Sequence, residues 1–432
     1  MTLDPWPSCR VACVHITPEH ALPLAGYLNR RGPSDGVASA LEANVLLTAV
    51  DGAPLLLVAL DTLFCGAALR EGIRRRLAAS LPGLSGERVQ LIASHTHYAP
   101  SLDPSKPRLG VADTDYLAFC IERVAAIVES MLARPASTVR TCQRGSTVCR
   151  ANVYRRLRTW VRVRRSLRFR REVVTAPDPS VAVDRELRTA RLLGADGETL
   201  CVLWSWPCHA VSRGETRAIS ADFPGAAREA LREHHGMDLP VLYFPGFCGD
   251  LRPFLRPARL SLRGVLAMPF ARGFEVPDAA ARATLRRTVA DAARRAVEAA
   301  GERDFEVGSE GGSVRLSALP LARLLDGHAG PAELRCTHLS LPPLRFALVG
   351  AEVSSGYADA MAGVDFLSGC VNEVFGYLPT ARQVGEGGYE VDGFRRPFSL
   401  EGRFRTDIDG VVRSLLRGSE RVEAGGASDR PV

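Results

Sequence analysis

The sequence predicts an α/β fold in which strands and helices are mixed within one layered unit. Short apolar runs typical of buried strands alternate along the chain with longer segments of helical periodicity. The 432 residues are 46% hydrophobic and 24% charged, an ordinary globular composition that supports a large core. Neither an internal repeat nor a low-complexity linker divides the chain. One α/β unit is therefore favoured over two separate domains.

The elements of the first third follow from apolar spacing and turn residues. Leucines and isoleucines at helical spacing predict helices at 67–81 and 115–132, the second with Thr114 as a candidate cap. The turn Asp51-Gly52-Ala53-Pro54 joins two apolar runs, which predicts paired strands. Strands are expected at 45–50, 55–60 and 89–93.

The rest of the chain repeats this mixture. The Gly-Ala-Asp-Gly turn after Leu193 predicts a hairpin whose second strand leads to His209. An alanine-rich helix is expected at 279–300 and a further helix at 224–233. The remaining strands are expected at 241–244, 336–341 and 345–349, the last of them leading to Glu352.

Positive charge gathers in one segment, 150–171, where arginines alternate with apolar residues such as Trp160 and Phe169. This alternation predicts a strand or hairpin with one basic face. Such a face suits phosphate, an acidic substrate or an anionic membrane surface; a solvated insertion is the alternative interpretation. Nucleic-acid binding is not expected, because no recognition motif accompanies the net charge of +7.

The expected cellular location follows from the cysteine pattern and from the search for membrane and signal segments. The 11 cysteines show no CxxC spacing, and Cys65, Cys120, Cys201 and Cys208 lie in apolar surroundings typical of buried thiols. No apolar run is long enough for a membrane helix, and the first residues do not read as a signal peptide. We expect a cytoplasmic protein without a transmembrane segment.

Two histidines form the first candidate site. His95 and His97 follow the apolar run 89–93, and residues two apart along a strand point to one side. Both imidazoles would then face one cleft, where neutral imidazole is a common zinc ligand. Paired histidines held by hydrogen bonds are the alternative.

Further potential ligands follow other strands. His209 comes after one apolar run and Glu352 after another. Together with His95 they make a plausible His₂Glu set, which leaves a zinc position open for water. A core histidine and a carboxylate at a helix N-terminus are the alternative interpretations of His209 and Glu352.

A series of motifs in matching order resembles the catalytic domain of the neutral/alkaline ceramidases, zinc amidases that release fatty acid from N-acylsphingosine. The resemblance covers most of the chain. The motifs are 25–27 with 30–33, 93–100 (Ala-Ser-His-Thr-His-Tyr-Ala-Pro), 208–211 (Cys-His-Ala-Val), 220–225 (Ser-Ala-Asp-Phe-Pro-Gly), 246–250 (Gly-Phe-Cys-Gly-Asp), Glu352, and 376–380 with Tyr389.

This resemblance implies stacked mixed β-sheets flanked by helices, one Zn²⁺ per chain, and roles for individual residues. Asp222 and Asp250 could also orient histidines, or act in capping and turns. The implied metal ligands are His95, His209, Glu352 and Tyr377. Together with residues at which the chain departs from the family, we expect a catalytic group of His97, Tyr389 and Arg252, and a substrate-binding group of Arg155, Tyr98 and Asp222.

The sequence also departs from the family. Arg252 occupies the position of a serine that takes part in amide cleavage, and a protonated guanidinium cannot be a nucleophile. It could instead bind a substrate anion. Tyr98 replaces a small residue and would narrow the cleft. We expect a single catalytic domain over 1–418, with the insertion at 150–171, a flexible tail at 419–432, and no C-terminal immunoglobulin-like domain.

The leading hypothesis is a bacterial-type zinc-dependent amidohydrolase of lipid metabolism that cleaves a linear amide by a metal-activated water. Its small-molecule or lipid-like N-acyl substrate is expected to be more polar than ceramide, with an anionic group as one option. The alternatives are a biosynthetic enzyme that uses the same site for acyl transfer or cyclisation, and a catalytically silent ceramidase-like binding protein. The sequence does not give the oligomeric state.

Overall fold

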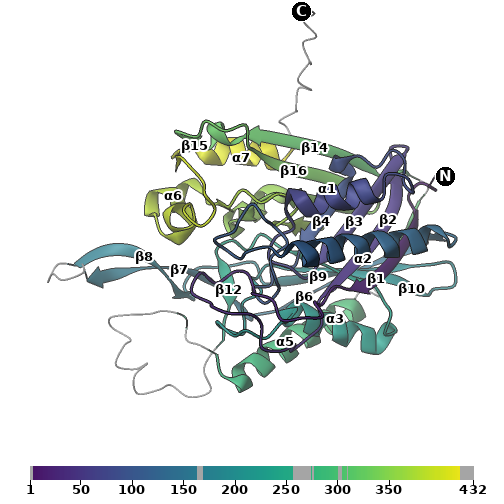
Figure 1. Cartoon of the computed structure of the whole chain (residues 1–432), viewed down its shortest axis with the longest axis horizontal. Helices are drawn as coiled ribbons and strands as arrows, with labels where there is room; N and C mark the ends of the chain where they lie inside the picture. Colours follow the sequence, from purple (N-terminus) through teal and green to yellow (C-terminus); the bar gives the residue numbers. More distant parts are fainter. Residues whose placement is uncertain are drawn as a thin grey trace, which may run out of the picture.

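Two five-stranded sheets stack face to face, and helices cover their outer sides (Figure 1). This is the arrangement in the computed structural model, which describes residues 3–162, 169–255, 274, 277–299, 304–308 and 310–418. In order across the first sheet lie β4 (Val89–Ala93), β3 (Ala53–Leu60), β2 (Glu42–Val50), β1 (Ser8–His15) and β5 (Ser137–Thr138). Across the second lie β11 (Val241–Pro245), β10 (Thr199–Trp206), β9 (Glu186–Leu193), β6 (Thr141–Val148) and β13 (Asp304–Glu306).

Both faces of these sheets are buried, as the alternation of side chains requires. Along β3, Leu56 and Val58 belong to the core beneath helices α1 (Gly66–Arg76) and α2 (Thr114–Leu132), whereas Leu55 and Leu57 face the second sheet. Along β10, Leu203 faces the first sheet. On the other side of β10, apolar residues pack against α3 (Asp222–His235) and α5 (Ala279–Glu298). The expected stack of mixed sheets between helices is confirmed.

A long hairpin projects from this body (Figure 1). Its strands, β7 (Asn152–Arg162) and β8 (Phe169–Asp178), pair antiparallel, and β12 (Leu251–Pro253) pairs with the base of β7. The hairpin expected for the arginine-rich segment is therefore present, since both of its strands pair as described. Trp160 is 62% exposed and Phe169 52% exposed. Residues 163–168 and the expected tail at 419–432 lie outside the described residues.

The C-terminal part adds a four-stranded sheet and several short elements. Two short strand pairs complete it, and one of these, β18 with β20, belongs to the candidate site. The elements are β14 (Ser313–Pro320), β16 (Glu333–Leu341), β17 (Leu344–Val349) and β19 (Phe366–Ser368) in the sheet; β15 (Leu325–Asp326) with β21 (Arg403–Phe404); β18 (Glu352–Val353) with β20 (Tyr377–Leu378); the short helical turns η3 (Leu321–Arg323), η4 (Ser355–Met361) and η5 (Tyr389–Gly393); and helices α6 (Ala381–Glu386) and α7 (Ile408–Leu416). A further helical turn, η1 (Gly86–Arg88), directly precedes β4 in the first part of the chain.

Most expected elements are confirmed, and two details were wrong. The helix expected at 67–81 ends at Arg76, because the chain turns ahead of Pro82, although Leu77 and Leu81 are still buried. The cap of α2 is Asp113, whose carboxylate accepts from the amide of Tyr116 at 2.8 Å.

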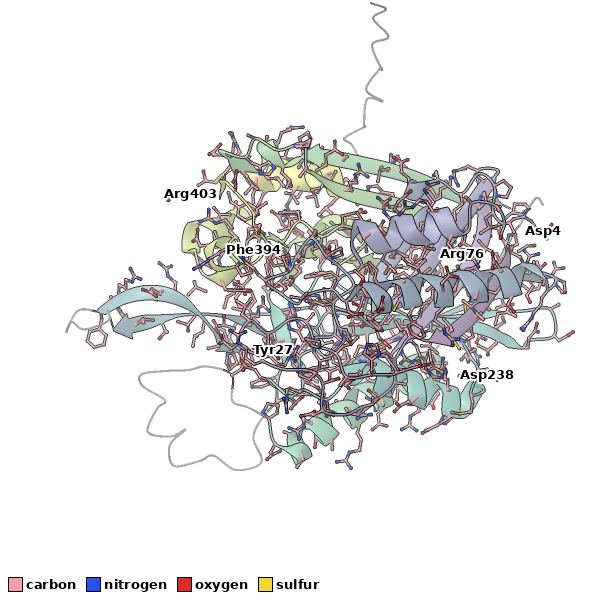
Figure 2. All side chains as sticks on the ribbon, viewed as in Figure 1. Asp4, Tyr27, Arg76, Asp238, Phe394 and Arg403 are labelled. Carbon is pink, nitrogen blue, oxygen red and sulfur yellow. The ribbon has the colours of Figure 1, made fainter. Side chains whose placement is uncertain are left out.

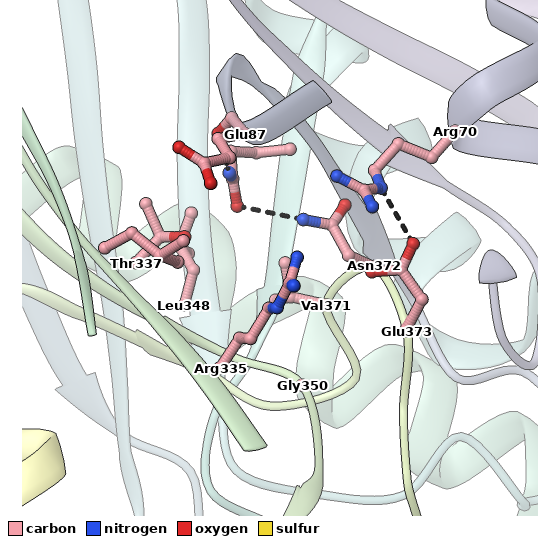
Figure 3. Close-up of a pocket in the computed structure, with 11 residues that line it drawn as sticks. Arg70, Glu87, Arg335, Thr337, Leu348, Gly350, Val371, Asn372 and Glu373 are labelled. Carbon is pink, nitrogen blue, oxygen red and sulfur yellow. Dashed lines mark hydrogen bonds and ion pairs between the residues drawn. The ribbon is translucent and has the colours of Figure 1, made fainter. Parts of the chain in front are cut away.

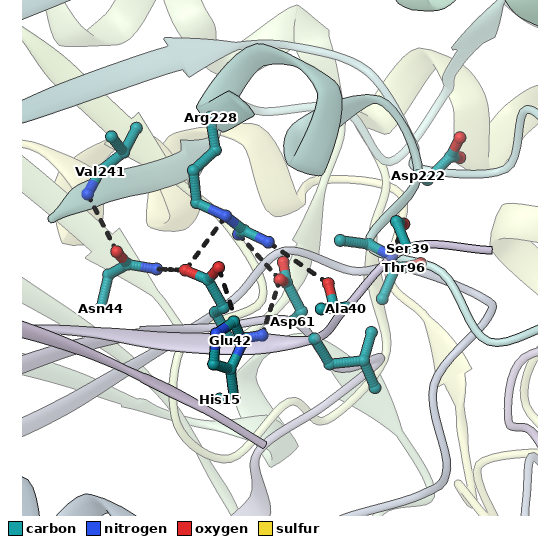
Figure 4. A network of polar contacts seen from close by, with 12 residues as sticks. His15, Ser39, Ala40, Glu42, Asn44, Asp61, Thr96, Asp222, Arg228 and Val241 are labelled. Atoms are coloured by element: carbon teal, nitrogen blue, oxygen red, sulfur yellow. Dashed lines mark hydrogen bonds and ion pairs between the residues drawn. The ribbon is translucent and has the colours of Figure 1, made fainter. Parts of the chain in front are cut away.

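A buried network of charges fixes α3 against the first sheet (Figure 4). Arg232 donates two hydrogen bonds to Glu42, at 2.8 and 2.9 Å. Arg228 lies 2.8 Å from Asp61 and 3.2 Å from Glu42. Because α3 begins beside the candidate site, this network helps to hold one wall of the site in place.

All eleven cysteines are free thiols, and ten of them are buried. Within the described part of the chain, no helix combines the length and the apolar character needed to cross a bilayer.

Candidate metal centre

His95 reaches the site through a turn rather than along a strand. The strand β4 ends at Ala93, and His95 takes a left-handed backbone conformation with φ of +60°. The expectation that strand alternation aims His95 and His97 the same way was therefore wrong in its cause. The two rings nevertheless lie together, with centroids 5.1 Å apart.

His209 follows β10 and is held by a backbone carbonyl. Its Nδ1 lies 2.7 Å from the carbonyl oxygen of Cys248. Since a carbonyl only accepts, Nδ1 carries the proton and Nε2 is left with a lone pair. The Nδ1 of His95 is held in the same way, 3.1 Å from the carbonyl oxygen of Leu63. Both histidines thus present Nε2 as a potential ligand.

Glu352 and Tyr377 come from neighbouring strands. They are register partners in the parallel pair β18 and β20, so the fold places them side by side. Both side chains are buried, 4% and 5% exposed. The Tyr377 ring also lies parallel to that of His209, with centroids 6.5 Å apart. Burial and the charge of Glu352 hold the pKa of Tyr377 well above its ordinary value.

These donor atoms converge in a way that suits a cation. Oε2 of Glu352 lies 3.0 Å from Nε2 of His209 and 3.3 Å from Nε2 of His95. Burial, with the charge of Arg155 next, lowers the pKa of His209 to about 3, so its ring is neutral. The neutral His209 ring and the His95 ring both face this carboxylate, and Nε2 of His95 has no hydrogen-bond partner. A divalent metal ion would satisfy all three groups, so the residues present fit zinc.

His97 adds a third imidazole to the cluster. His95, His97 and His209 each offer a ring nitrogen, and these atoms lie within 4.8 Å of one another. Neither ring nitrogen of His97 has a hydrogen-bond partner. Its ring lies against the backbone of Gly26, where a Cβ would come within 2.5 Å of Nδ1. Gly26 is thus required for His97 to lie here.

Arg155 enters the cluster from β7. Its Nη1 donates to Nε2 of His209 at 3.2 Å, and its Nε donates to Glu390 at 2.7 Å. Arg156 contacts the other oxygen of Glu390, also at 2.7 Å. Nη2 of Arg155 is buried without a partner. A buried guanidinium with one free N–H group beside the histidines is placed to donate to a carbonyl oxygen or an oxyanion.

Aromatic side chains border the cluster on two sides. The Tyr27 ring lies 5.2 Å from His97, and the Phe394 ring lies 5.1 Å from Tyr377; both residues are labelled in Figure 2. Tyr389 begins η5, with its ring 5.7 Å from that of Tyr377. Burial raises the pKa of Tyr389 to about 12, so its hydroxyl is protonated at neutral pH and able to donate.

Tyr98 and Asp222 brace the loop that follows His209. The Tyr98 hydroxyl accepts from the amide of Arg213 at 2.8 Å. Both carboxylate oxygens of Asp222 accept from Ser212, one from its amide at 2.8 Å and one from its hydroxyl. Neither Tyr98 nor Asp222 bonds directly to a histidine ring within the described residues. Their expected contact with substrate stays a prediction.

Asp250 and Gly249 fix the backbone around Glu352. The Asp250 carboxylate accepts from the Ser354 hydroxyl at 2.6 Å and from Gln383 at 2.8 Å. Gly249 donates its amide to the carbonyl of Val353 at 2.8 Å. A Cβ on Gly249 would lie 2.6 Å from the carbonyl oxygen of Glu352. The Gly-Asp loop therefore needs its glycine so that the strand carrying Glu352 can approach.

A hollow elsewhere is too small to compete as a substrate site. It lies between Arg70, Arg335 and Asn372, and Figure 3 shows the ion pair of Arg70 with Glu373 at its edge. Its volume is about 20 Å³, room for about one water molecule.

The structure thus brings together His95, His97, His209, Glu352, Tyr377, Arg155 and Tyr389. The sequence analysis did not identify some of the residues that hold these side chains in position. Glu390, Arg156 and Gln383 were not singled out. Glu390 stands beside Tyr389 in the sequence, but its partner Arg155 is 235 positions away. Nothing local could have paired them.

Comparison of the sequence with known protein families finds no match, and comparison with curated proteins finds none. Solved structures do match in fold. A neutral ceramidase from Pseudomonas aeruginosa superposes with a TM-score of 0.70 at 17% identity, covering 96% of this chain and 75% of that chain. A ceramidase complexed with C2 gives 0.69 at 16% identity, with coverages of 96% and 76%. The chain therefore has the fold of the ceramidase catalytic domain.

Proposed function

We propose that this protein is a zinc-dependent amidohydrolase that cleaves the N-acyl bond of a linear amide. The observation that carries this proposal is the convergence of two Nε2 lone pairs on the Glu352 carboxylate beside an unpartnered N–H group of Arg155. The ceramidase fold supports the same reaction class, since those neighbours are named as ceramidases.

The zinc ligands in this proposal are His95, His209, Glu352 and Tyr377. His97 lies within reach of the same position, and its unpartnered ring nitrogens leave it free to ligate the metal or to contact substrate. Zinc bound there would supply a water of lowered pKa and polarise the substrate carbonyl.

The remaining roles belong to the chain's own side chains. Arg155 donates its free Nη2–H to the carbonyl oxygen as negative charge develops there, and Glu390 holds the guanidinium in place. Tyr389 carries a proton at neutral pH and donates it toward the tetrahedral centre or the departing amine. Removing one such donor typically costs about 10²–10³ in rate.

The decisive experiment measures metal content and amide hydrolysis together. Purified protein should hold about one zinc per chain, and the double variant His95→Ala/His209→Ala should lose it. The wild type should release fatty acid from N-acyl compounds, and the double variant should not. His338→Ala is the matched control, because His338 lies on β16 outside the cluster. A wild type that takes up no zinc, or full activity in the double variant, would overturn the proposal.

A further inference from the structure

A hollow lined by arginines adjoins the histidine cluster at Tyr27. Its volume is about 450 Å³, within the range of small-molecule sites. Its lining includes Val211, residues 213–216, Arg252 and Pro253 of β12, and Phe274. Among the described residues that line it, there are three arginines and one carboxylate, that of Glu215; the arginines are Arg213, Arg252 and Arg282. This excess of positive charge favours an anionic ligand.

Arg252 connects this hollow to the proposed catalytic group. In the pairing of β12 with β7, Arg252 lies opposite Val153. Arg155 follows Val153 by two positions, at an irregularity of β7 between Tyr154 and Arg156. The amide of Arg155 donates to the carbonyl of Asp250 at 2.9 Å, two residues before Arg252, and the charge of Arg155 acts on the Arg252 guanidinium, so the two arginines are neighbours. A small substrate could contact both.

Arg252 also differs from the other arginines buried around the site. Arg155, Arg156 and Arg228 each meet a carboxylate at 2.7 to 2.8 Å. Among the described residues Arg252 has no such partner, and its guanidinium rests against the ring of Phe274 at 4.4 Å. Burial, with the charge of Arg155 adding to it, lowers the pKa of Arg252. A half-buried cation without an anion costs free energy that a bound anion would recover.

We propose that Arg252 binds a carboxylate or phosphate group on the amine-derived half of the N-acyl substrate. The proposal rests on the function proposed above and names its substrate class. Arg155 takes the amide carbonyl, and the neighbouring Arg252 takes an anion joined to the amide nitrogen by a short spacer. The arginine-rich lining suits this polar half of the substrate better than an acyl chain.

The experiment compares matched charged and neutral substrates. N-lauroylglycine and N-lauroyl-O-phosphoethanolamine carry the two anions, and N-lauroylglycine methyl ester and N-lauroylethanolamine are their neutral counterparts. The wild type should prefer at least one anionic substrate over its neutral counterpart by about tenfold or more in kcat/KM, the equivalent of about 1.4 kcal/mol. The anion that shows the preference identifies the source.

The variant Arg252→Gln should reduce that preference to within about twofold of unity, mainly through KM. Arg252→Lys keeps the charge without the planar fork and should retain part of the preference. Arg158→Gln removes an exposed arginine of β7 outside the hollow and should leave the preference unchanged. Circular dichroism of each variant confirms folding, and the lysine variant serves as the test if the glutamine variant is unfolded.

The outcomes separate the two proposals. Equal hydrolysis of charged and neutral substrates overturns anion recognition and leaves amide hydrolysis standing. If no substrate is cleaved, calorimetric titration with N-lauroylglycine decides between the proposals. Binding that is abolished by Arg252→Gln supports the anion site, and the proposal of amide hydrolysis is then rejected. Neither turnover nor binding overturns both.

Discussion

Arg155 and Glu390 form a buried ion pair, with Nε and Oε1 2.7 Å apart, that joins β7 to the turn carrying Tyr389. Glu390 also binds Arg156 at 2.7 Å, so one carboxylate neutralises two buried guanidinium groups. The pair sets the position of Arg155 beside His209. It links the base of the projecting hairpin to the candidate metal centre.

The variant Glu390→Gln should therefore affect both stability and catalysis. Removing one partner of a buried ion pair leaves an uncompensated charge and typically costs about 3–5 kcal/mol. We expect a loss of this size in the free energy of unfolding, measured by urea denaturation. In the folded variant kcat should fall at least tenfold while zinc content stays near one per chain. Glu390→Asp should recover part of kcat; an unchanged kcat in Glu390→Gln would contradict the positioning role.

Gly249 allows a test of how closely the Gly-Asp loop must approach Glu352. In Gly249→Ala the new Cβ would meet backbone oxygen atoms of Glu352 and Val353 at 2.6 and 3.0 Å. Backbone must shift, so zinc affinity should fall at least tenfold, measured by competition with a chelator. Gly410→Ala is the matched control: it lies in α7 with open space around it and should raise stability by about 0.5–1 kcal/mol. Wild-type zinc affinity in Gly249→Ala would contradict this account of the loop.

Local signals in the sequence were enough to predict most of the fold. β4 was expected at its observed bounds, since the mostly apolar run Val-Gln-Leu-Ile-Ala before His95 is typical of a buried strand. The hairpin of β9 and β10 followed from its Gly-Ala-Asp-Gly turn. The helix from Gly66 was overextended because its apolar spacing continues through a turn that is not helical.

The site was less predictable because its geometry depends on long-range contacts. From the sequence, strand alternation was expected to bring His95 and His97 together. In the structure, His95 lies beyond the strand in a left-handed backbone conformation. The Nδ1 atoms of His95 and His209 are held by the backbone carbonyl groups of Leu63 and Cys248. Every residue has such a carbonyl, so the amino-acid sequence does not reveal these contacts. Resemblance to a known family supplied Tyr377 and Tyr389, whereas Glu390 was found only in the structure.

The buried network around Glu42 predicts a pH dependence of stability. Burial alone would raise the pKa of Glu42, but Arg228 and Arg232 outweigh it, so the pKa lies below its ordinary value of 4.5. A carboxylate with a depressed pKa contributes stability that is complete above 4.5 and is lost as the pH falls through the folded-state pKa. Burial raises the pKa of Asp61, which contributes with the opposite sign.

The variant Glu42→Gln isolates the contribution of Glu42. A carboxylate titrates between roughly pH 6 and pH 3. Over this range the free energy of unfolding should fall more for the wild type than for the variant. Denaturant titrations at several pH values measure both slopes. At pH 7 the variant should be about 3 kcal/mol less stable, because Arg232 loses its bidentate partner. Parallel pH profiles would refute the assignment.

The last prediction separates the two possible metal-ligand sets. The three imidazole nitrogens alone lie within 4.8 Å of one another, whereas the proposed set replaces His97 with Glu352 and Tyr377. Glu352 lies 3.0 and 3.3 Å from two of the nitrogens and cancels part of a divalent charge, which three neutral rings do not. Glu352→Gln should thus weaken zinc binding at least a hundredfold, while His97→Ala should leave about one zinc per chain and reduce turnover. Both variants are measured by metal analysis after dialysis against a chelator. Zinc lost from His97→Ala but kept by Glu352→Gln would establish the three-histidine set and remove Glu352 from the ligands.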